Sequence, residues 1–363
     1  MEKAFFINGG AGRVLCSIPA LEHYAETHDD FVIVAESWGE FYAMSPKLRD
    51  KAFPINHKGL FHDYLIDKEI ISAEPYRLNA YFNQKANLIQ AFDILVNGQD
   101  SPNEVPKTKP LSLEINKKDQ IVGHNICNEV KDTLKKDKVI VFQPFGSTVE
   151  VQGNFIVDTS GRSFELSNVQ EIISELQKDY AIIIMSQVAI PGWEKMGVAY
   201  PKDVSLLQWA GVINASDYFL GCDSVGQHMA HAVGKPATVV IGSTFPENIT
   251  YPDNKDFNII DLGLDKRLYS PIRMVFDDTS DRVNESLMVM DDSIHKKIKK
   301  TIKDKIGVSK KTVIPKLSPG TDSSPLPLLP GKKASVNGFS LPGKQINKKK
   351  PIDEILDLNE IKN

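Results

Sequence analysis

Cysteine and long apolar segments are both scarce in this chain of 363 residues. Its three cysteines, Cys16, Cys127 and Cys222, form no C-x-x-C pair, so the sequence indicates neither a disulfide framework nor a zinc site. The first residues, MEKAFFINGGAGR, lack the continuous apolar segment of a signal peptide, and no apolar run is long enough to span a bilayer. We therefore expect no transmembrane segment and a cytosolic location.

Negative charge dominates the chain, but it is unevenly distributed. The net charge is −4, with fifteen Lys and no Arg against two Asp in residues 295–350, a local charge of +13. Residues 351–363 carry −3, which leaves −14 on residues 1–294. An acidic body therefore precedes a basic arm, and the arm has to be interpreted separately from the fold.

The amino-terminal residues alternate between strand and helix patterns. Ala4–Ile7 reads as a strand, Asn8–Gly12 as a glycine-rich turn, 14–27 as a helix and Phe31–Ala35 as the next strand. A dinucleotide-binding fingerprint would place a third glycine where Leu15 stands, and its acidic residue would be Glu36. Because that fingerprint is incomplete, a nicotinamide-dependent dehydrogenase using Gly10, Gly12 and Glu36 ranks last among the functions considered.

The second half holds the most regular strand, loop and helix pattern, from Asn214 to Pro246. The apolar run 218–221 predicts a buried strand, and 227–233 predicts the helix that follows it. The strand 139–142 ends in a loop that contains Gly146, Ser147 and Thr148. Small and polar residues also stand at the carboxyl ends of the strands 218–221 and 237–241: Asp223, Ser224, Gly226, Gly242, Ser243 and Thr244. The two loops after 218–221 and 237–241, at one edge of a parallel sheet, predict a phosphate site.

Strands alternate with helices through most of the chain, so the expected class is α/β with parallel, doubly wound sheets. We expect a hinge near Asp137 and three parts: domain 1–137, domain 138–307 and a tail, 308–363. The tail is rich in Pro, Gly, Ser and Lys, which predicts disorder. Its last residues, 351–363, could form one short acidic amphipathic helix on a protein partner.

Three segments together resemble a known family: GGAGRVLCSIPAL, VIVFQPFGST and GCDSVGQHMAHAVGKPATVVIGSTFPEN. They look like glycosyltransferase family 9, the bacterial ADP-heptose:lipopolysaccharide heptosyltransferases, in which two Rossmann-like domains form the GT-B arrangement. The match is most specific where a D-[ST]-x-x-x-H-x-A-x-x-x-G-x-P motif runs from Asp223 through His228 to Pro236. The resemblance covers residues 4 to 250 in outline and would suit a divergent, phage-type member.

The resemblance assigns a donor site for a nucleotide-diphosphate sugar. It implies that Asp223 accepts hydrogen bonds from sugar hydroxyls and that Ser224, Val225 and Gly226 hold the diphosphate. The further donor-side residues that it implies are Gly146, Ser147, Thr148, Arg162, His228 and Thr244. Arg162 would neutralise the leaving phosphate, because a departing nucleoside diphosphate gains negative charge. The scheme calls on no cofactor and no metal.

The amino-terminal turn departs from the family. It would form the acceptor side with Gly9, Gly10 and Gly12, but Arg13 stands where the family usually has the aspartate that serves as candidate base. Because arginine cannot accept a proton at neutral pH, a carboxylate such as Glu36 or Glu40 would have to act instead. Otherwise the acceptor needs no strong base, or the protein binds without catalysing; Arg13 itself could contact an anionic acceptor or the donor phosphate.

The leading prediction is a metal-independent glycosyltransferase of hexosyl or heptosyl type. Its acceptor stays open between a glycan such as lipopolysaccharide and a nucleic acid, which the +13 arm could hold through its phosphates. The alternative is a non-catalytic GT-B-fold protein that docks to a partner through 351–363. That peptide loosely resembles those that recruit proteins, including some sugar transferases of phage DNA, to sliding clamps.

Overall fold

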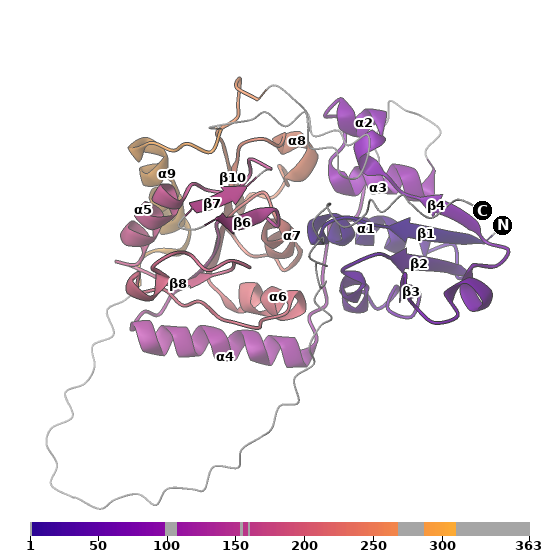
Figure 1. The fold of residues 1–363 in the computed structure, drawn as a ribbon, viewed down its shortest axis with the longest axis horizontal. Helices are drawn as coiled ribbons and strands as arrows, with labels where there is room; N and C mark the ends of the chain where they lie inside the picture. The colour runs from indigo at the N-terminus through magenta and orange to yellow at the C-terminus, as the bar shows by residue number, and fades with distance from the viewer. Residues whose placement is uncertain (1, 99–106, 153–154, 159, 268–286, 310–363) are drawn as a thin grey trace, which may run out of the picture. The chain divides into compact units, whose positions relative to one another are not determined.

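The computed structural model describes residues 2–98, 107–152, 155–158, 160–267 and 287–309 (Figure 1). Residues 1–313 form one compact unit, so the domain boundary that the sequence predicts near Asp137 stays a prediction. The predicted tail and its terminal peptide lie outside the described residues, except for 308 and 309.

The first sheet has four parallel strands in the order β3-β2-β1-β4. Their bounds are Lys3–Ile7 (β1), Phe31–Ala35 (β2), Ala52–Pro54 (β3) and Glu69–Ser72 (β4). Alternate residues of a strand face opposite sides, and Phe5 therefore joins the core under the helices α1 (Ala11–Tyr24) and α3 (Leu88–Asn97). Ala4 and Val32 face the other side, where Leu60 and Leu65 cover them.

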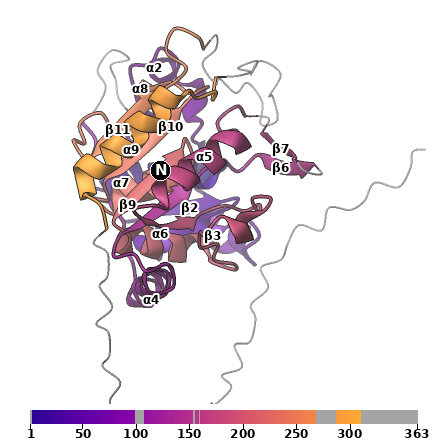
Figure 2. The same ribbon diagram turned by 90° about the vertical axis from the view of Figure 1, so that its left-hand side faces the viewer.

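The second sheet has five parallel strands in the order β11-β10-β9-β5-β8. They are Val139–Gln143 (β5), Ala181–Ile184 (β8), Tyr218–Cys222 (β9), Ala237–Ile241 (β10) and Phe257–Asp261 (β11). Helices α4 (Lys117–Leu134), α6 (Leu206–Ala215) and α7 (Val225–Ala232) share one face. Helices α5 (Leu166–Leu176) and α9 (Asp292–Ile306) pack on the other (Figure 2).

Each sheet has one point at which the chain switches the direction in which it adds strands. In the first sheet that point lies between β1 and β4, and in the second it lies between β5 and β9. Parallel α/β sheets bind ligands in the crevice outside the carboxyl ends of the strands at such points. The topology therefore marks two places: the loops after β1 and β4, and the loops after β5 and β9.

Helix α4 lies along α6 at close range, as Figure 1 also shows. A Cβ atom on Gly123 would stand 2.2 Å from the carbonyl oxygen of Gly211, and one on Gly211 would stand 2.2 Å from that of Asp119. The two glycines therefore let the helix backbones touch, which binds α4 to the helices of the second sheet.

Most of the predicted elements are confirmed within a few residues, with two differences. Helix α1 begins at Ala11, so Gly12 and Arg13 lie in its first turn and Gly10 is its N-cap. The stretch after Thr148, read from the sequence as a polar loop, forms an antiparallel hairpin of β6 (Val149–Gln152) and β7 (Phe155–Asp158). This hairpin delivers Asp158 to the second sheet's carboxyl edge.

Shorter elements complete the described chain. They are the 3₁₀ helices η1 (Gly39–Met44), η3 (Pro75–Arg77) and η4 (Trp193–Lys195), the π-helix η2 (Phe61–Leu65), and the short α-helices α2 (Asn79–Phe82) and α8 (Pro246–Ile249). Among the described residues, every helix is too short or too polar to cross a membrane.

Candidate functional site

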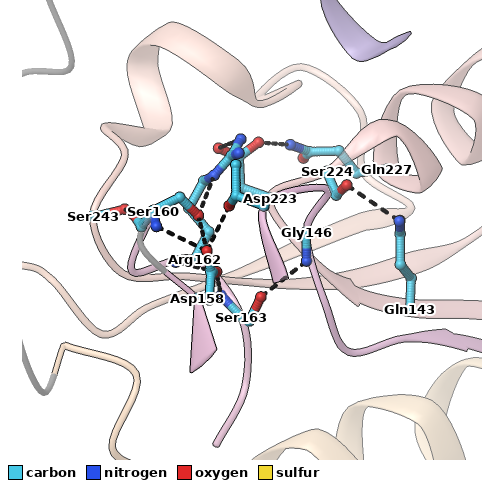
Figure 3. Close-up of polar contacts among 11 residues, drawn as sticks. Gln143, Gly146, Asp158, Ser160, Arg162, Ser163, Asp223, Ser224, Gln227 and Ser243 are labelled. Carbon is cyan, nitrogen blue, oxygen red and sulfur yellow. Dashed lines mark hydrogen bonds and ion pairs between the residues drawn. The ribbon is translucent and has the colours of Figure 1, made fainter. Parts of the chain in front are cut away.

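The side chain of Gln143 joins the two strand ends at the switch point of the second sheet (Figure 3). Its Nε2 donates to Ser224 Oγ at 3.2 Å, and its Oε1 accepts from the backbone N–H of Gly226 at 2.9 Å. Gln143 is the last residue of β5, whereas Ser224 and Gly226 follow β9 and begin α7. The amide therefore satisfies one of the free N–H groups at the start of this helix.

This close packing accounts for the absence of a side chain at Gly226. A Cβ atom there would lie 2.3 Å from Gln143 Oε1 and 2.7 Å from the Phe219 ring. The predicted contact of its N–H with a diphosphate stays a prediction, and it requires Gln143 to move aside. Val225 beside it is half-buried and packs against the core that α4, α6 and α7 share.

Asp158 organises the loop that follows β7. Its Oδ1 accepts from Thr148 Oγ1 at 2.6 Å and from the N–H and hydroxyl of Ser160 at 2.8 and 2.7 Å. Its Oδ2 accepts from the N–H groups of Arg162 and Ser163 at 3.2 and 2.8 Å. Burial raises the pKa of Asp158, but the hydrogen bonds from Ser163, Thr148 and Ser160 outweigh it and hold the pKa well below its usual value.

Arg162 is the cation that this loop presents to the site (Figure 3). Its side chain is 20% exposed, its Nε donates to Ser160 Oγ at 3.1 Å, and its NH1 lies 3.8 Å from Asp223 Oδ2. Burial lowers the pKa of Arg162, yet the carboxylates of Asp223 and Asp158 raise it above its ordinary value. The guanidinium therefore stays charged in a position only partly open to water.

Gly146 lies against the same loop. Its N–H donates to Ser163 Oγ at 2.9 Å, and a Cβ atom on Gly146 would stand 3.9 Å from Arg162 NH2. The two residues that follow it, Ser147 and Thr148, are exposed. Thr148 serves the site indirectly, because its hydroxyl is bonded to Asp158.

Asp223 is 4% exposed and directs its carboxylate toward Arg162 and Gln227. Gln227 Nε2 donates to Asp223 Oδ1 at 2.6 Å, while the buried Oε1 of the same amide has no hydrogen-bond partner among the described atoms. Buried polar atoms are nearly always paired, so this oxygen marks a place where a ligand or water belongs.

The loop after β10 closes the site from another side. Ser243 Oγ donates to the carbonyl of Ser160 at 3.0 Å, which ties this loop to the Asp158 loop. Thr244 is 7% exposed, and its hydroxyl has no partner within the described part of the chain. Arg267 Nε supports the loop by donating to the carbonyl of Gly242 at 2.9 Å, and its guanidinium lies 5.0 Å from the Phe245 ring.

His228 points away from this group. Its Nδ1 lies 2.6 Å from Tyr251 Oη and 3.5 Å from Cys16 Sγ, and its ring packs against the first turn of α1. A Cβ atom on Gly12 would stand 2.8 Å from His228 Cδ2, so Gly12 is needed for the close approach of α1 and α7. Burial lowers the pKa of His228 to about 4, which keeps the imidazole neutral at pH 7. Its described contacts give His228 a packing role.

At the switch point of the first sheet, Arg13 is buried and engaged. Its NH1 donates to Glu74 Oε2 at 3.1 Å, its NH2 donates to the carbonyl of Ala73 at 2.8 Å, and its guanidinium lies 5.1 Å from the Tyr76 ring. These contacts engage both terminal nitrogens of Arg13, whereas its buried Nε has no hydrogen-bond partner among the described atoms. The predicted catalytic role of Arg13 stays a prediction. The pairing brings a carboxylate that the sequence did not single out, Glu74, to the first turn of α1.

The remaining acceptor-side predictions fall nearby. Glu36 is exposed at the end of β2, as is Glu40 a few residues further on. Gly9 has a φ of +96°, and a Cβ atom on it would meet Arg13 Cδ at 2.9 Å, which accounts for glycine there. Gly10 is exposed, with open space around its Cβ position.

The structure therefore brings together four predicted donor-side residues, Gly146, Arg162, Asp223 and Ser224, with Thr148 and Thr244 in adjoining loops. Reasoning from the sequence missed Asp158, Gln143 and Glu74. A signal for Asp158 was present, since an Asp followed by small polar residues is typical of a loop that bonds its own backbone. Gln143 and Glu74 act through partners far away in the chain, which no local pattern marks.

Comparison with solved structures confirms the fold. The chain is similar to a glycosyl transferase family 9 protein from Veillonella parvula, with a TM-score of 0.59 and 11% identity over 83% of this chain and 96% of that one. It is also similar to E. coli ADP-heptose lps heptosyltransferase II, with a TM-score of 0.53 and 11% identity over 83% of this chain and 99% of that one. These likenesses show a GT-B-like α/β fold with parallel sheets. No protein-family model matches the sequence, and no curated protein matches it either.

Proposed function

We propose that this protein is a glycosyltransferase that binds a nucleotide-diphosphate sugar at the carboxyl edge of its second sheet. One observation carries the proposal: a charged, partly buried Arg162 lies 3.8 Å from Asp223 on a loop fixed by Asp158. This pair stands where the topology of the sheet places a ligand. The fold shared with transferases supports the class.

On the donor side, Asp223 accepts hydrogen bonds from the sugar hydroxyls, and Arg162 contacts the diphosphate. The long separation of 3.8 Å leaves the guanidinium able to turn from Asp223 to a phosphate oxygen. When the bond between the anomeric carbon and the diphosphate breaks, the electron pair leaves with the nucleoside diphosphate. The guanidinium then stabilises that charge without any metal ion.

On the acceptor side, Glu74 is the general base of this proposal. Arg13 holds its carboxylate beside the first turn of α1, where the family resembled by the sequence has an aspartate. The Glu74 side chain is 22% exposed, so an acceptor hydroxyl can reach it. The hydroxyl oxygen attacks the anomeric carbon and its proton passes to Glu74.

The charge of the chain favours a glycan over a nucleic acid as the acceptor. Residues 1–294 carry −14, and an acidic body repels a polyphosphate chain, whereas a neutral glycan meets no such barrier. The donor nucleotide and sugar are to be identified by binding.

Calorimetric titration with ADP, UDP and their sugars, with NAD as the unrelated control, tests the donor site. Arg162→Ala should weaken diphosphate binding at least tenfold, because it removes a charge-assisted contact. Arg49→Ala is the matched control, because it removes the same charge from a half-exposed residue outside the site. Binding of NAD alone, or equal affinities of both variants for the diphosphate ligands, would reject the donor site.

Release of nucleoside diphosphate in the presence of acceptor tests the base. Glu74→Gln should lower kcat by about 10² to 10⁴ while leaving donor affinity unchanged. Glu36→Gln, at the exposed end of β2, should leave kcat within a factor of a few. The reverse result would assign the proton transfer to Glu36, and tight donor binding with no turnover in any acceptor panel would favour a binding protein.

A further inference from the structure

We propose that Glu171, Asp292 and His295 form a binding site for a divalent transition-metal ion of the zinc class, between α5 and α9. The three residues each offer one ligand atom, and these atoms lie within 4.8 Å of one another. The two helices lie side by side in Figures 1 and 2. Nothing in the proposed transfer reaction uses this cluster.

The orientation of the His295 ring follows from its neighbour Asn168. The Asn168 amide nitrogen donates to the carbonyl of Met288 at 3.3 Å, which turns its Oδ1 toward His295 Nε2 at 3.2 Å. Since Asn168 Oδ1 can only accept, the proton of the neutral imidazole lies on Nε2. The lone pair of Nδ1 is therefore free for a ligand.

That lone pair faces a second acceptor. His295 is 8% exposed, and its buried Nδ1 has no hydrogen-bond partner among the described residues, although it lies 3.2 Å from Glu171 Oε1. Two acceptors at this distance repel each other unless a cation lies between them. The separation matches the edge of a tetrahedral zinc site, about 3.3 Å for bonds of about 2.0 to 2.1 Å.

Asp292 supplies the third ligand. It is the first residue of α9, one turn before His295, and the cap of that helix is the neighbouring Asp291, which bonds Ser293 and Ile294. Asp292 is exposed and Glu171 has 48% of its side chain exposed, so both carboxylates can close on an ion from their present positions. Water would complete the coordination.

The ligand set indicates the class of metal. An imidazole nitrogen with two carboxylates suits zinc and its neighbours in the first transition row, whereas magnesium prefers oxygen ligands alone. The Asn168 carbonyl on Nε2–H is the kind of partner that orients a metal-binding histidine. An ion here would join the start of α9 to α5, the helix that follows the Arg162 loop.

Metal analysis of the full chain tests this proposal. After chelation and dialysis, the wild-type protein should take up one equivalent of Zn²⁺ that Glu171→Gln and Asp292→Asn each lose. Both replaced residues are exposed, so the variants should fold. Glu175→Gln is the matched control: Glu175 lies one turn from Glu171 on α5 and pairs with Lys299 at 2.8 Å, and its loss should leave uptake unchanged.

Thermal unfolding gives a second readout. At a free Zn²⁺ concentration of about 100 times Kd, Tm should rise by roughly 5 °C in the wild type and in Glu175→Gln, and Mg²⁺ should have no such effect. Equal uptake of Zn²⁺ by all four proteins would place the ion elsewhere and overturn the proposal. No uptake of Zn²⁺ by the wild type would overturn the proposal as well.

Discussion

Replacement of Asp158 by Asn tests how the Arg162 loop is held. The carboxylate accepts five hydrogen bonds, three at Oδ1 and two at Oδ2. An amide keeps one oxygen and brings one NH2 group. The amide can be oriented in two ways. The better orientation places its oxygen at the two fixed N–H groups of Arg162 and Ser163, because the hydroxyls of Thr148 and Ser160 can rotate to accept from the NH2 group.

In this orientation the Ser160 N–H faces the NH2 group, which is also a donor. The substitution therefore loses the hydrogen bond from the Ser160 N–H and the negative charge. Hydrogen bonds to charged groups contribute about 1.5 to 3 kcal/mol, so Asp158→Asn should destabilise the protein by about 2 to 3 kcal/mol. Looser anchoring of Arg162 should weaken diphosphate binding by about twofold to tenfold, because one long side chain must then be ordered on binding.

Denaturant unfolding and calorimetry measure the two effects, with Glu150→Gln in the same hairpin as the control for lost charge. The folded pKa of Asp158 is depressed, so its contribution is complete above the unfolded value of about 3.9 and is lost as pH falls through the folded value. The difference between Asp158→Asn and wild type should therefore be full at pH 7 and shrink below about pH 4. If Asp158→Asn matched Glu150→Gln in both stability and affinity, the loop would not depend on Asp158.

Two further predictions concern the contact between α1 and α7. Gly12→Ala should destabilise the protein by about 1 to 3 kcal/mol, since its Cβ would lie 2.8 Å from the His228 ring. Gly10→Ala, whose Cβ would enter open space, should be nearly neutral. Equal effects of the two substitutions in unfolding experiments would contradict this packing. The depressed pKa of His228, about 4, should lower stability as pH falls from about 6.5 to 4, by about 3 kcal/mol in all, because the unfolded chain takes up the proton first. His228→Gln should make this part of the pH profile of the unfolding free energy less steep, and an unchanged slope would assign it to other groups such as His231, whose pKa burial also lowers to about 4.

Much of the second sheet could be predicted because three of its strands, β5, β9 and β10, are short apolar runs buried on both faces. The runs 139–142, 218–221 and 237–241 all occur as strands, with the predicted small polar residues at their carboxyl ends. The hairpin β6–β7 was missed because its strands have only four residues each, which is too short for the alternation in β6 or the apolar run in β7 to stand out.

The chemistry at the strand ends was only partly predictable. Asp223 and Arg162 stand out as residue types in loops, whereas the roles of Gln143 and Glu74 depend on partners 81 and 61 residues away. The contacts of Arg13 could not be predicted from the sequence either. Its charge favours contact with an anionic ligand, yet its two terminal nitrogens donate to Glu74 and to the Ala73 carbonyl in the fold.

The most direct test of the central claim is calorimetric titration of the wild type and Asp223→Asn with a nucleotide-diphosphate sugar and with the matching nucleoside diphosphate. Asp223 faces the sugar in this account and Arg162 faces the diphosphate. Asp223→Asn should therefore lose the additional affinity that the sugar provides while binding the nucleoside diphosphate as the wild type does. Equal affinity of the wild type and Asp223→Asn for the nucleotide sugar, or no binding of any nucleotide sugar by the wild type, would contradict the account.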